Sequence, residues 1–465
     1  MVTVPGFVPN PNFPQLSDKV TVGYDEKRGR FIKAIEDVPV GEVVCVEEGI
    51  TVNVNPEACY RCLQCFENTG FAYCSNCEDF YEPDDIACGK YDKLGIFKLA
   101  AHLVFCYPFA NMAALVTKDE PEVAQSAPTS LSTKDPESVF QLKPFPAIAE
   151  PFRLPEVQEA ISEIVKSLEN DANWGRLDND TRLLTFTKAL RIVAERCAKN
   201  AHTIYSIADL ESKDRSLPLG TGLFPIGAIF NHSCNPNVHG FFVRNTFIFV
   251  SRGVKAGEEL TDTYGVTYNQ HTLAERTDFL NRVSGFQCHC DSCVQQKSYD
   301  KELERCFNDV NKVAKEASCL LDIREYTEYI VPGSVEIENL IIAFSKRSDA
   351  SVYDEFMFGL WKKFVENAKL RGLDYDPYLV QPYVEMVMLT WNEDVACTDE
   401  EKASILFTTH RLLNNFYVGF HPLSDVIKQL VDNAAKLSRN EIRNLVSRLQ
   451  HRARVMWKRD DLDMN

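Results

Sequence analysis

The chain has 465 residues and a formal net charge of −17, and 45% of its residues are hydrophobic and 25% charged. This composition is that of a globular protein large enough for two or three domains, and it contains no apolar run that predicts a membrane span. The acidity argues against sequence-independent binding of nucleic-acid phosphates, which requires a basic surface. It would suit a basic peptide substrate, although acidic surfaces more often serve solubility alone. The N-terminus lacks the basic flank and apolar stretch of a signal peptide, so we expect a cytoplasmic or nuclear protein.

Short apolar segments near the N-terminus predict β-strands. They lie at 20–24, 31–34 and 42–46, and Pro39-Val40-Gly41 is expected to separate the last two. These strands could also form a plain β-hairpin with no functional role.

Clustered cysteines are the next local signal in the sequence. The chain has sixteen cysteines, and eight of them form two clusters, which predicts metal binding rather than disulfides. The first cluster consists of two Cys-x-x-Cys pairs, Cys59 with Cys62 and Cys74 with Cys77, whose four thiolates suit a tetrahedral zinc ion. A second group, Cys288-His289-Cys290-Asp291-Ser292-Cys293, lies far along the chain.

The middle of the chain is expected to be helical and to contain one long loop. Residues 91–115 are apolar, and helical periodicity returns around 161–168 and at 181–201. Between the first two helices, residues 117–155 are rich in Pro, Ser, Thr, Glu and Lys, which predicts a mobile loop.

Three motifs then follow in order. An apolar approach, Gly220–Pro225, leads into Asn231-His232-Ser233-Cys234-Asn235-Pro236-Asn237, and Gly257–Gly265 carries a late tyrosine. Residues 237–254 predict a β-hairpin that turns at Arg244-Asn245.

Beyond the second cysteine group the sequence predicts helices to its end. Apolar stripes begin at Met357 and Leu423, the first closed by Gly372, and Ser438-Arg439-Asn440-Glu441 predicts a capping box before a third stripe. Helix pairs of this size allow an array like that of tetratricopeptide repeats, and we assign no chemistry to the stripes.

The three motifs and the cysteine tail resemble the carboxyl half of a SET methyltransferase domain followed by its post-SET zinc tail. The Cys-x-x-Cys pairs, inserted after the first strands, resemble the MYND finger of the SET-and-MYND family of protein-lysine methyltransferases. The resemblance implies an α+β fold, in which a SET-type β-fold is split by a zinc finger and a helical insert. The expected parts are the N-terminal half of SET at 17–55, a shortened MYND-like finger at 56–90, the helical insert at 91–215 with the mobile loop 117–155, the C-terminal half of SET at 216–270, the post-SET zinc tail at 271–296 and a helical TPR-like domain at 297–465.

The first cysteine cluster departs from the family pattern. The family's finger uses seven cysteines and one histidine for two zinc ions, whereas the later cysteine pair and the histidine-containing tail are missing here. We therefore expect one zinc ion in the finger, held by Cys59, Cys62, Cys74 and Cys77, with Cys65 and Cys88 as remnants of the second site. With the tail, two zinc ions are expected for the whole chain.

The resemblance also implies an activity and the residues that perform it. The activity is S-adenosylmethionine-dependent methylation of lysine side chains in histone or non-histone proteins, with the zinc finger and the helical domain available to protein partners in chromatin. Tyr264 would act at the transferring methyl group, and Phe286 would stack on the adenine of the donor. The other expected donor contacts are Arg28, the backbone of Arg30, Asn200, Asn231 and His232, and the expected ligands of the second zinc ion are Cys234, Cys288, Cys290 and Cys293.

Several alternatives stay open at this point. Asn231 and His232 could be ordinary buried polar groups, Tyr264 a packed strand residue, and Arg28 a solvated surface residue. Many family members have a tyrosine where this chain has Ser284, and the family's serine before the Asn-His-Ser-Cys segment is Ala228 here. A donor-binding but inactive scaffold is therefore the second hypothesis. A zinc hydrolase is disfavoured because two all-cysteine sites leave no open coordination position.

Overall fold

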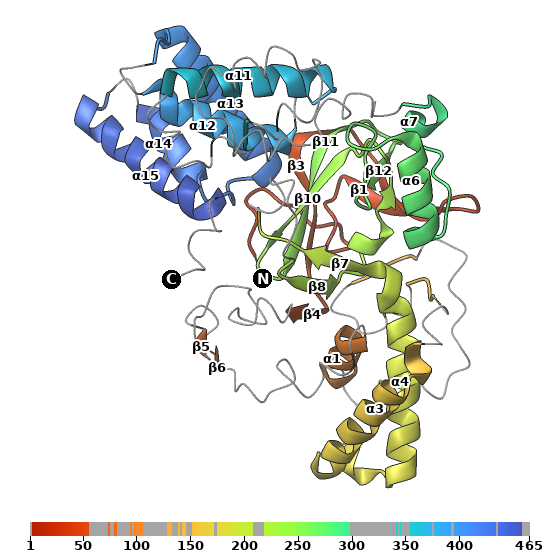
Figure 1. Ribbon diagram of the computed structural model, residues 1–465. Helices are drawn as coiled ribbons and strands as arrows, with labels where there is room; N and C mark the ends of the chain where they lie inside the picture. The colour runs from red at the N-terminus through yellow and green to blue at the C-terminus, as the bar shows by residue number, and fades with distance from the viewer. Residues whose placement is uncertain are drawn as a thin grey trace. The chain divides into compact units, whose positions relative to one another are not determined.

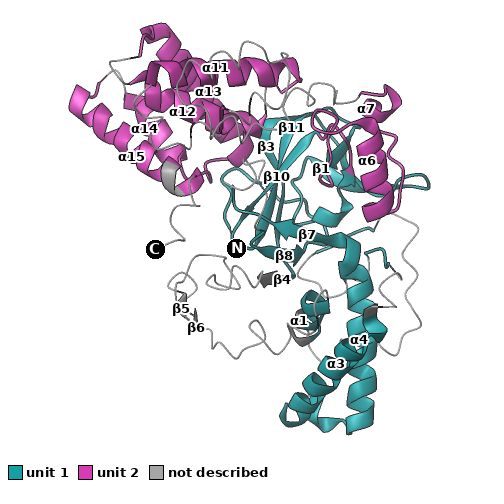
Figure 2. Cartoon of the chain, in the orientation of Figure 1, with its two compact units in different colours: residues 1–210, 214–231, 237–262 teal, residues 211–213, 232–236, 263–465 magenta. Residues whose placement is uncertain are grey.

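The computed structural model describes residues 2–54, 73–74, 79–80, 94, 97–106, 128–132, 138–139, 142–145, 151–171, 174–207, 218–297, 338, 341–342, 345, 354–373, 376–391, 395–433 and 436–457. The chain divides into two compact units, drawn in teal and magenta in Figure 2. Unit 1 comprises residues 1–210, 214–231 and 237–262, and unit 2 comprises residues 211–213, 232–236 and 263–465. Most strands belong to unit 1 and the C-terminal region is helical, so the chain mixes helix and strand (Figure 1).

The strands form small sheets that join distant parts of the sequence. The first sheet has the order β1 (Val20–Asp25), β2 (Gly29–Ala34), β12 (Glu259–Asp262) and β9 (Asn231–His232). The second has the order β10 (Val238–Val243), β11 (Thr246–Val254) and β3 (Val38–Glu48). The third has the order β4 (Thr51–Val54), β8 (Gly220–Leu223) and β7 (Ala201–Ile204), and β5 (Tyr73–Cys74) pairs with β6 (Asp79–Phe80). Strands β2, β3 and β4 pair with β12, β11 and β8, so the two ends of unit 1's sequence build one β-fold.

The N-terminal strands agree with the sequence prediction except at Pro39. Residues 39–41, which were expected to lie between two strands, belong to β3, and this strand runs unbroken from Val38 to Glu48. The proline is tolerated because β3 lies at the edge of its three-stranded sheet, where a missing N–H costs no bond on the outer side. The register against β11 also shifts between Phe249 and Arg252, and such a bulge absorbs the irregular backbone around the proline.

The predicted hairpin at 237–254 is confirmed and supplies much of the aromatic core. Strands β10 and β11 pair from Val238 with Ser251 to Val243 with Thr246, and Arg244 in the turn has a φ of 58°. Phe242 stacks on Phe247 with ring centroids 4.4 Å apart. Because such rings bury large apolar areas, they fix the hairpin against the rest of the β-fold.

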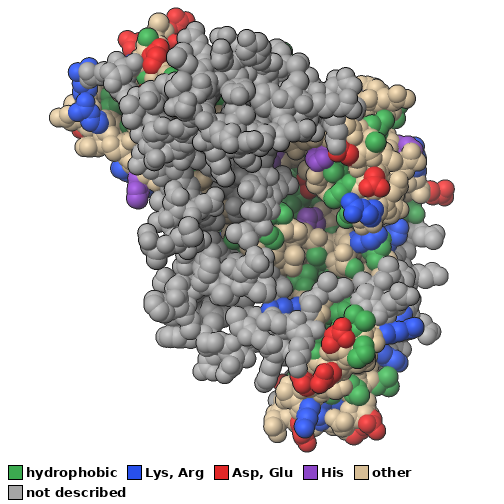
Figure 3. Space-filling model, in the orientation of Figure 1, with side chains coloured by type: hydrophobic (Ala, Val, Ile, Leu, Met, Phe, Trp, Pro, Cys, Tyr) green, Lys and Arg blue, Asp and Glu red, His purple; other side chains and the backbone are tan. Residues whose placement is uncertain are grey.

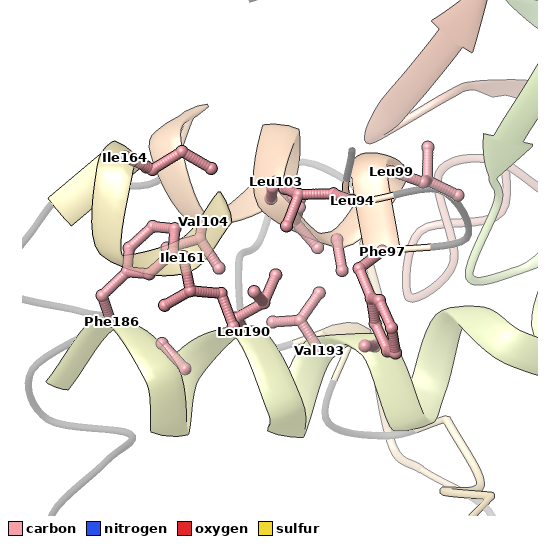
Figure 4. Close-up of a cluster of buried hydrophobic side chains, with 14 of the residues drawn as sticks. Leu94, Phe97, Leu99, Leu103, Val104, Ile161, Ile164, Phe186, Leu190 and Val193 are labelled. Atoms are coloured by element: carbon pink, nitrogen blue, oxygen red, sulfur yellow. The ribbon is translucent and has the colours of Figure 1, made fainter. Parts of the chain in front are cut away.

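Three helices of unit 1 form a separate apolar core. Most of the side chains labelled in Figure 4 come from α1 (Lys98–Cys106), α3 (Pro155–Ser167) and α4 (Asn179–Asn200), and Leu94 and Phe97, just before α1, belong to the same cluster. Ile161, Phe186 and Leu190 are fully buried, and each contributes about 1.5–3 kcal/mol by leaving water. Asp178 is the N-cap of helix α4, and its carboxylate accepts the backbone N–H of Thr181. Short 3₁₀ helices flank them: η5 (Pro151–Arg153), η6 (Leu168–Asn170) and η7 (Trp174–Arg176).

Parts of the segment 117–155 pack into these cores. Leu131 is buried with the apolar residues of the β-fold, and Val139 and Leu142 are buried with the helices of Figure 4. At these described positions the segment therefore contributes apolar side chains to the cores of unit 1.

The C-terminal region of unit 2 consists of amphipathic helices, as the apolar stripes predict. They are η12 (Pro377–Leu379), α11 (Asp354–Leu370), α12 (Val380–Thr390), α13 (Asp399–Tyr417), α14 (Ser424–Asn433) and α15 (Arg439–Trp457). The predicted stripes of α11 and α14 are buried, and Gly372 follows α11 with a φ of +79°. The predicted capping box is present, because Ser438 N–H donates to Glu441 at 2.8 Å and Glu441 N–H donates to the Ser438 hydroxyl at 3.4 Å. Among the described helices, none is both long and apolar enough to cross a membrane.

The segment before these helices carries the cysteine tail. Helix α6 (Leu273–Phe279) begins with a capping box formed by Thr272 and Glu275. It continues into the π-helical turn η9 (Leu280–Ser284), and Gly285 follows with a φ of 75°. The short helix α7 (Asp291–Val294) starts from Cys290.

Candidate functional site

A buried carboxylate holds the loop that leads from β8 toward Asn231. Glu47 in β3 is fully buried and accepts the backbone N–H groups of Ile226 at 2.9 Å and Gly227 at 2.6 Å. A short 3₁₀ helix, η8 (Gly227–Ile229), follows, and β9 begins two residues later. Glu47 therefore fixes the approach to the Asn-His-Ser-Cys segment, a role that no sequence motif indicated.

Asn231 is oriented by two acceptors within unit 1. Its Nδ2 donates to the backbone oxygen of Arg30 at 3.1 Å and to Glu259 Oε1 at 2.8 Å. Both partners can only accept, so the amide nitrogen must face them. The Asn231 Oδ1 atom is thereby left as an acceptor for a further donor group.

The two arginines of the β1–β2 hairpin have opposite surroundings. Arg28 donates to Asp25 at 2.6 Å and to Glu259 at 2.7 Å, and its guanidinium lies 3.9 Å from the centre of the Phe31 ring. Hydrogen bonds from Arg28 in turn lower the pKa of the Asp25 carboxyl. In contrast, the Nη1 atom of Arg30 is buried without a hydrogen-bond partner among the described residues, and burial lowers the pKa of Arg30. Of the two arginines, Arg30 is therefore the one whose charge has no counter-ion in the described part of the chain.

In unit 2, His232 lies between Tyr264 and Cys234. The Tyr264 backbone N–H donates to His232 Nδ1 at 3.0 Å, and His232 Nε2 lies 3.3 Å from Cys234 Sγ. Since Nδ1 accepts, the neutral ring carries its hydrogen on Nε2 and directs it at the sulfur. Burial lowers the pKa of His232 to about 4, against the opposing effect of Cys290 and with help from the charge of Arg276. The ring is therefore neutral at physiological pH.

Aromatic rings surround this histidine. The His232 centroid is 5.3 Å from that of Tyr264 and 6.2 Å from that of Phe286. The Tyr264 and Phe286 rings are 6.2 Å apart and nearly perpendicular, at 88°. Three residues predicted for one site from separate motifs are thus brought together within unit 2.

Four cysteines of unit 2 form a candidate metal centre. The sulfur atoms of Cys234, Cys288, Cys290 and Cys293 all lie within 4.8 Å of one another, and those of Cys234 and Cys293 are 3.5 Å apart. Four sulfurs at about 2.3 Å from a tetrahedral zinc ion would be roughly 3.8 Å from each other, so the donor set fits this metal. Hydrogen bonds from the Cys234 and Cys288 thiols lower the pKa of Cys290, which favours its thiolate. The cluster could hold one metal ion.

The first predicted zinc site falls largely outside the described residues. Cys59, Cys62 and Cys77, and the expected remnants Cys65 and Cys88, all lie there, and Cys74 is described only as a backbone position in β5. The finger and its zinc ion therefore stay predictions.

Asn200 and the two departures from the family pattern occupy other positions. Asn200 ends α4, and its Nδ2 donates to the backbone oxygens of Arg196 at 2.7 Å and Lys143 at 3.0 Å. In the part of the chain that the structure describes, no hydrogen bond joins it to another predicted donor residue. Ser284 ends the π-helical turn two residues before Phe286, and Ala228 lies in η8.

The predicted residues fall into two groups, one in each unit. Unit 1 contains Arg28, Arg30, Asn200 and Asn231, and unit 2 contains His232, Tyr264, Phe286 and the four clustered cysteines. Sequence reasoning missed Glu47, Glu259 and Arg276. Glu259 stands in the Gly257–Gly265 motif, so a signal was present, but Asn231 and Arg28, which bond its carboxylate, are 28 and 231 residues away in sequence.

Comparison with known proteins identifies the family to which the chain is related. Residues 29–265, more than half of the chain, match the model of the SET domain. The SET domain-containing protein 3 of Caenorhabditis elegans is 61% identical over 458 residues, which cover 98% of each chain.

More distant similarities are shorter or weaker. The protein-lysine N-methyltransferase SMYD4 of Pongo abelii is 32% identical over 101 residues, covering 20% of this chain and 13% of that protein. A crystal structure of the SET domain of LSMT bound to lysine and AdoHcy aligns with 98% of this chain and 90% of its own. Its identity of 12% and TM-score of 0.22 are too low to support an argument.

Proposed function

The chain belongs to the SET domain family, and we propose that it transfers a methyl group from S-adenosylmethionine to the ε-amine of a lysine in a protein substrate. The observation that supports this best is the placement of His232, Tyr264 and Phe286 around one another, with the tyrosine backbone held by the histidine. The SET match ends one residue beyond this tyrosine. When bound, the donor supplies a methyl group on a positively charged sulfur, which needs no nucleophilic side chain from the protein.

The residues of unit 1 fit the amino-acid end of such a donor. A carboxylate would satisfy the buried, unpartnered Nη1 atom of Arg30, and an ammonium group would satisfy the free acceptor of Asn231. Arg28 is already engaged by two carboxylates, so we assign the carboxylate contact to the Arg30 side chain rather than to Arg28. Asn200 remains a proposed contact of the donor.

The residues of unit 2 would orient the reacting groups and exclude water. Phe286 offers an aromatic face for the adenine. His232 fixes the Tyr264 backbone, so that the tyrosine hydroxyl can hold the lysine amine in line with the methyl group. A free lysine has a pKa of about 10.4, so an apolar channel that disfavours the ammonium form would help to deliver the neutral amine.

The metal centre would be structural. Cys234, Cys288, Cys290 and Cys293 would supply all four ligands of a zinc ion, which leaves no open coordination position for chemistry. Its contribution is folding free energy for the cysteine tail. A second zinc ion in a shortened MYND-like finger at 56–90 remains part of the proposal.

The protein substrate is proposed to be a histone or another lysine-bearing protein, in the nucleus or the cytoplasm. The net charge of −17 favours a basic partner in general terms. On the described part of the face in Figure 3, however, acidic and basic side chains are interspersed over the α3–α4 region at the bottom of the view. Recognition through the finger or the TPR-like helices is therefore our proposal for partners in chromatin complexes.

Radiolabelled methyl transfer tests the activity. Purified full-length protein is incubated with labelled S-adenosylmethionine and either histones or cell lysate, with Tyr264→Phe as the matched control. We expect label on protein with the natural chain and at least a hundredfold less with the variant, because the hydroxyl that orients the amine is lost.

Calorimetry of donor binding separates the second hypothesis. Ser284 stands where an aromatic wall of the lysine channel is expected, which favours a weak or inactive acceptor side. Donor binding without any labelled protein would therefore indicate a scaffold, and absence of donor binding would contradict both hypotheses.

A further inference from the structure

A buried arginine beside the cysteine cluster has no carboxylate partner among the described residues. Arg276 in α6 is fully buried, and no described residue forms an ion pair with it. Its Nη1 donates to the backbone oxygen of His271 at 2.7 Å, and its Nη2 donates to that of Lys297 at 2.6 Å. A second buried arginine of unit 2, Arg371, instead meets the buried carboxylate of Glu338. Burying an uncompensated charge is costly, so the charge of Arg276 needs a counter-charge.

The cysteine cluster offers that counter-charge. Arg276 Nη2 lies 3.9 Å from Cys293 Sγ, and the four sulfurs lie within 4.8 Å of one another. Four thiolates around a divalent ion carry a net charge of about −2, and the buried Cys234 and the three half-buried cysteines shield part of that charge from water. Each charge therefore lowers the cost of burying the other.

We propose that Arg276 is the counter-charge of the four-cysteine metal site and a positioning residue for its ligand Cys293. The guanidinium fork holds the chain before the site through His271 and after it through Lys297, while one arm faces the sulfur. Groups of this kind, behind the ligands of a metal, typically change its affinity by about 10–100-fold.

The test follows metal release and does not involve methyl transfer, so its failure is distinct from failure of the proposed function. Full-length zinc-loaded protein is mixed with a chromogenic chelator, and the rate of zinc release is recorded. If zinc leaves in several kinetic phases, the phase that is absent in Cys293→Ser is assigned to the four-cysteine site. We expect Arg276→Met to accelerate that phase by about 10–100-fold and Arg276→Lys, which keeps the charge, by no more than about threefold.

Two arginines of the same chain serve as matched controls. Arg182 is buried and donates to the backbone oxygens of Trp174 and Leu177, but it belongs to unit 1 and bonds no thiol of a described residue. Arg282, six residues after Arg276, is 72% exposed. Arg182→Met and Arg282→Met should leave the release rate within about twofold of the natural chain, because neither faces a sulfur.

A spectroscopic measurement separates charge from clamping. In cobalt-loaded protein, a nearby positive charge lowers the energy of sulfur electrons, so Arg276→Met should move the thiolate-to-cobalt absorption to longer wavelength while Arg276→Lys should not. Equal acceleration of zinc release by both variants would overturn the counter-charge and leave only a backbone clamp. An unchanged rate of zinc release in Arg276→Met would overturn the whole proposal. If Arg276→Met does not fold, the test rests on Arg276→Lys: zinc release more than about threefold faster than in the natural chain would overturn the proposal.

Discussion

Asn231 and Cys234 are three residues apart in the sequence, yet they belong to regions that are held together by different forces. Asn231 is fixed by hydrogen bonds to Arg30 and Glu259 within a sheet of unit 1. Cys234 is buried in unit 2 among three other thiols, an arrangement that is stable when a metal ion binds them. The Asn231–Asn237 motif therefore contributes residues to both regions. A substitution in one region should affect donor binding, and a substitution in the other should affect metal binding.

Removal of one thiol from the cluster of Cys234, Cys288, Cys290 and Cys293 (the sulfur region) should abolish metal binding there, and this is the largest effect we expect. Cys290→Ser is expected to lose one metal ion per chain and to lower methyl transfer at least a hundredfold, because a closed zinc site needs four ligands. Elemental analysis and limited proteolysis measure this, with early cleavage expected within 263–297. The control is Cys397→Ser. Cys397 lies outside the cluster and donates to Glu401 at 3.5 Å, so this variant should keep the metal of the four-cysteine site. Immediate digestion of the whole chain would contradict the division into separate regions.

Removal of the amide should break the hydrogen-bonded region and leave the sulfur region intact. Asn231→Ala is expected to raise the donor dissociation constant about 10–100-fold, since a hydrogen bond to a charged group is worth roughly 1.5–3 kcal/mol. Calorimetry measures the affinity, and elemental analysis should find the metal content unchanged. Asn235→Ala, at an exposed position of the same motif, is the control. Loss of metal together with donor affinity would show that the two regions are not independent.

The two arginines sharpen the account of the hydrogen-bonded region. Arg30→Met should weaken donor binding about tenfold, and Arg28→Met no more than about threefold, because only Arg30 lacks a carboxylate partner. Titration with S-adenosylhomocysteine compares the two variants. The reverse order would restore the assignment that the sequence suggested for Arg28.

The smallest expected effect concerns acid stability of unit 1. His202 in β7 lies 5.0 Å from the Phe247 ring, and burial lowers its pKa to about 4, partly offset by a hydrogen bond to the Asn200 backbone. The unfolded chain binds a proton below about pH 6.5 and the folded chain only near 4, so stability is full above pH 6.5 and falls between these values. We expect His202 to account for about 1–2 kcal/mol of this loss, allowing for its partial exposure.

Urea unfolding at several pH values, compared with His202→Phe, isolates this contribution. The variant should lose less stability between pH 6.5 and 4, whereas its metal content should respond to acid as in the natural chain. An identical pH dependence in both proteins would show that unit 1 owes its acid sensitivity to other groups.

Much of the fold was predictable because its signals are local. The hairpin at 237–254, the stripes of α11 and α14 and the capping box at Ser438 follow from periodicity and cap chemistry over short windows. The strand through Pro39 was not predictable, because whether a proline is tolerated depends on the strand's place at the edge of a sheet.

The sequence named candidate site residues but not the hydrogen bonds that hold them. Motif order indicated Asn231, His232, Tyr264 and Phe286, and the spacing of three cysteines indicated a metal. The roles of Glu47 and Glu259 depend on partners that are up to 180 and 231 residues distant in sequence, which no local pattern encodes. The difference between Arg28 and Arg30 likewise depends on which carboxylates the fold brings near each guanidinium.

The most direct test of the account is mass spectrometry of protein substrates after incubation with the full-length chain and S-adenosylmethionine. We predict an added methyl group on a lysine side chain, present with the natural chain and lost with Tyr264→Phe. A methyl group on a residue other than lysine, or transfer that persists without the Tyr264 hydroxyl, would contradict it.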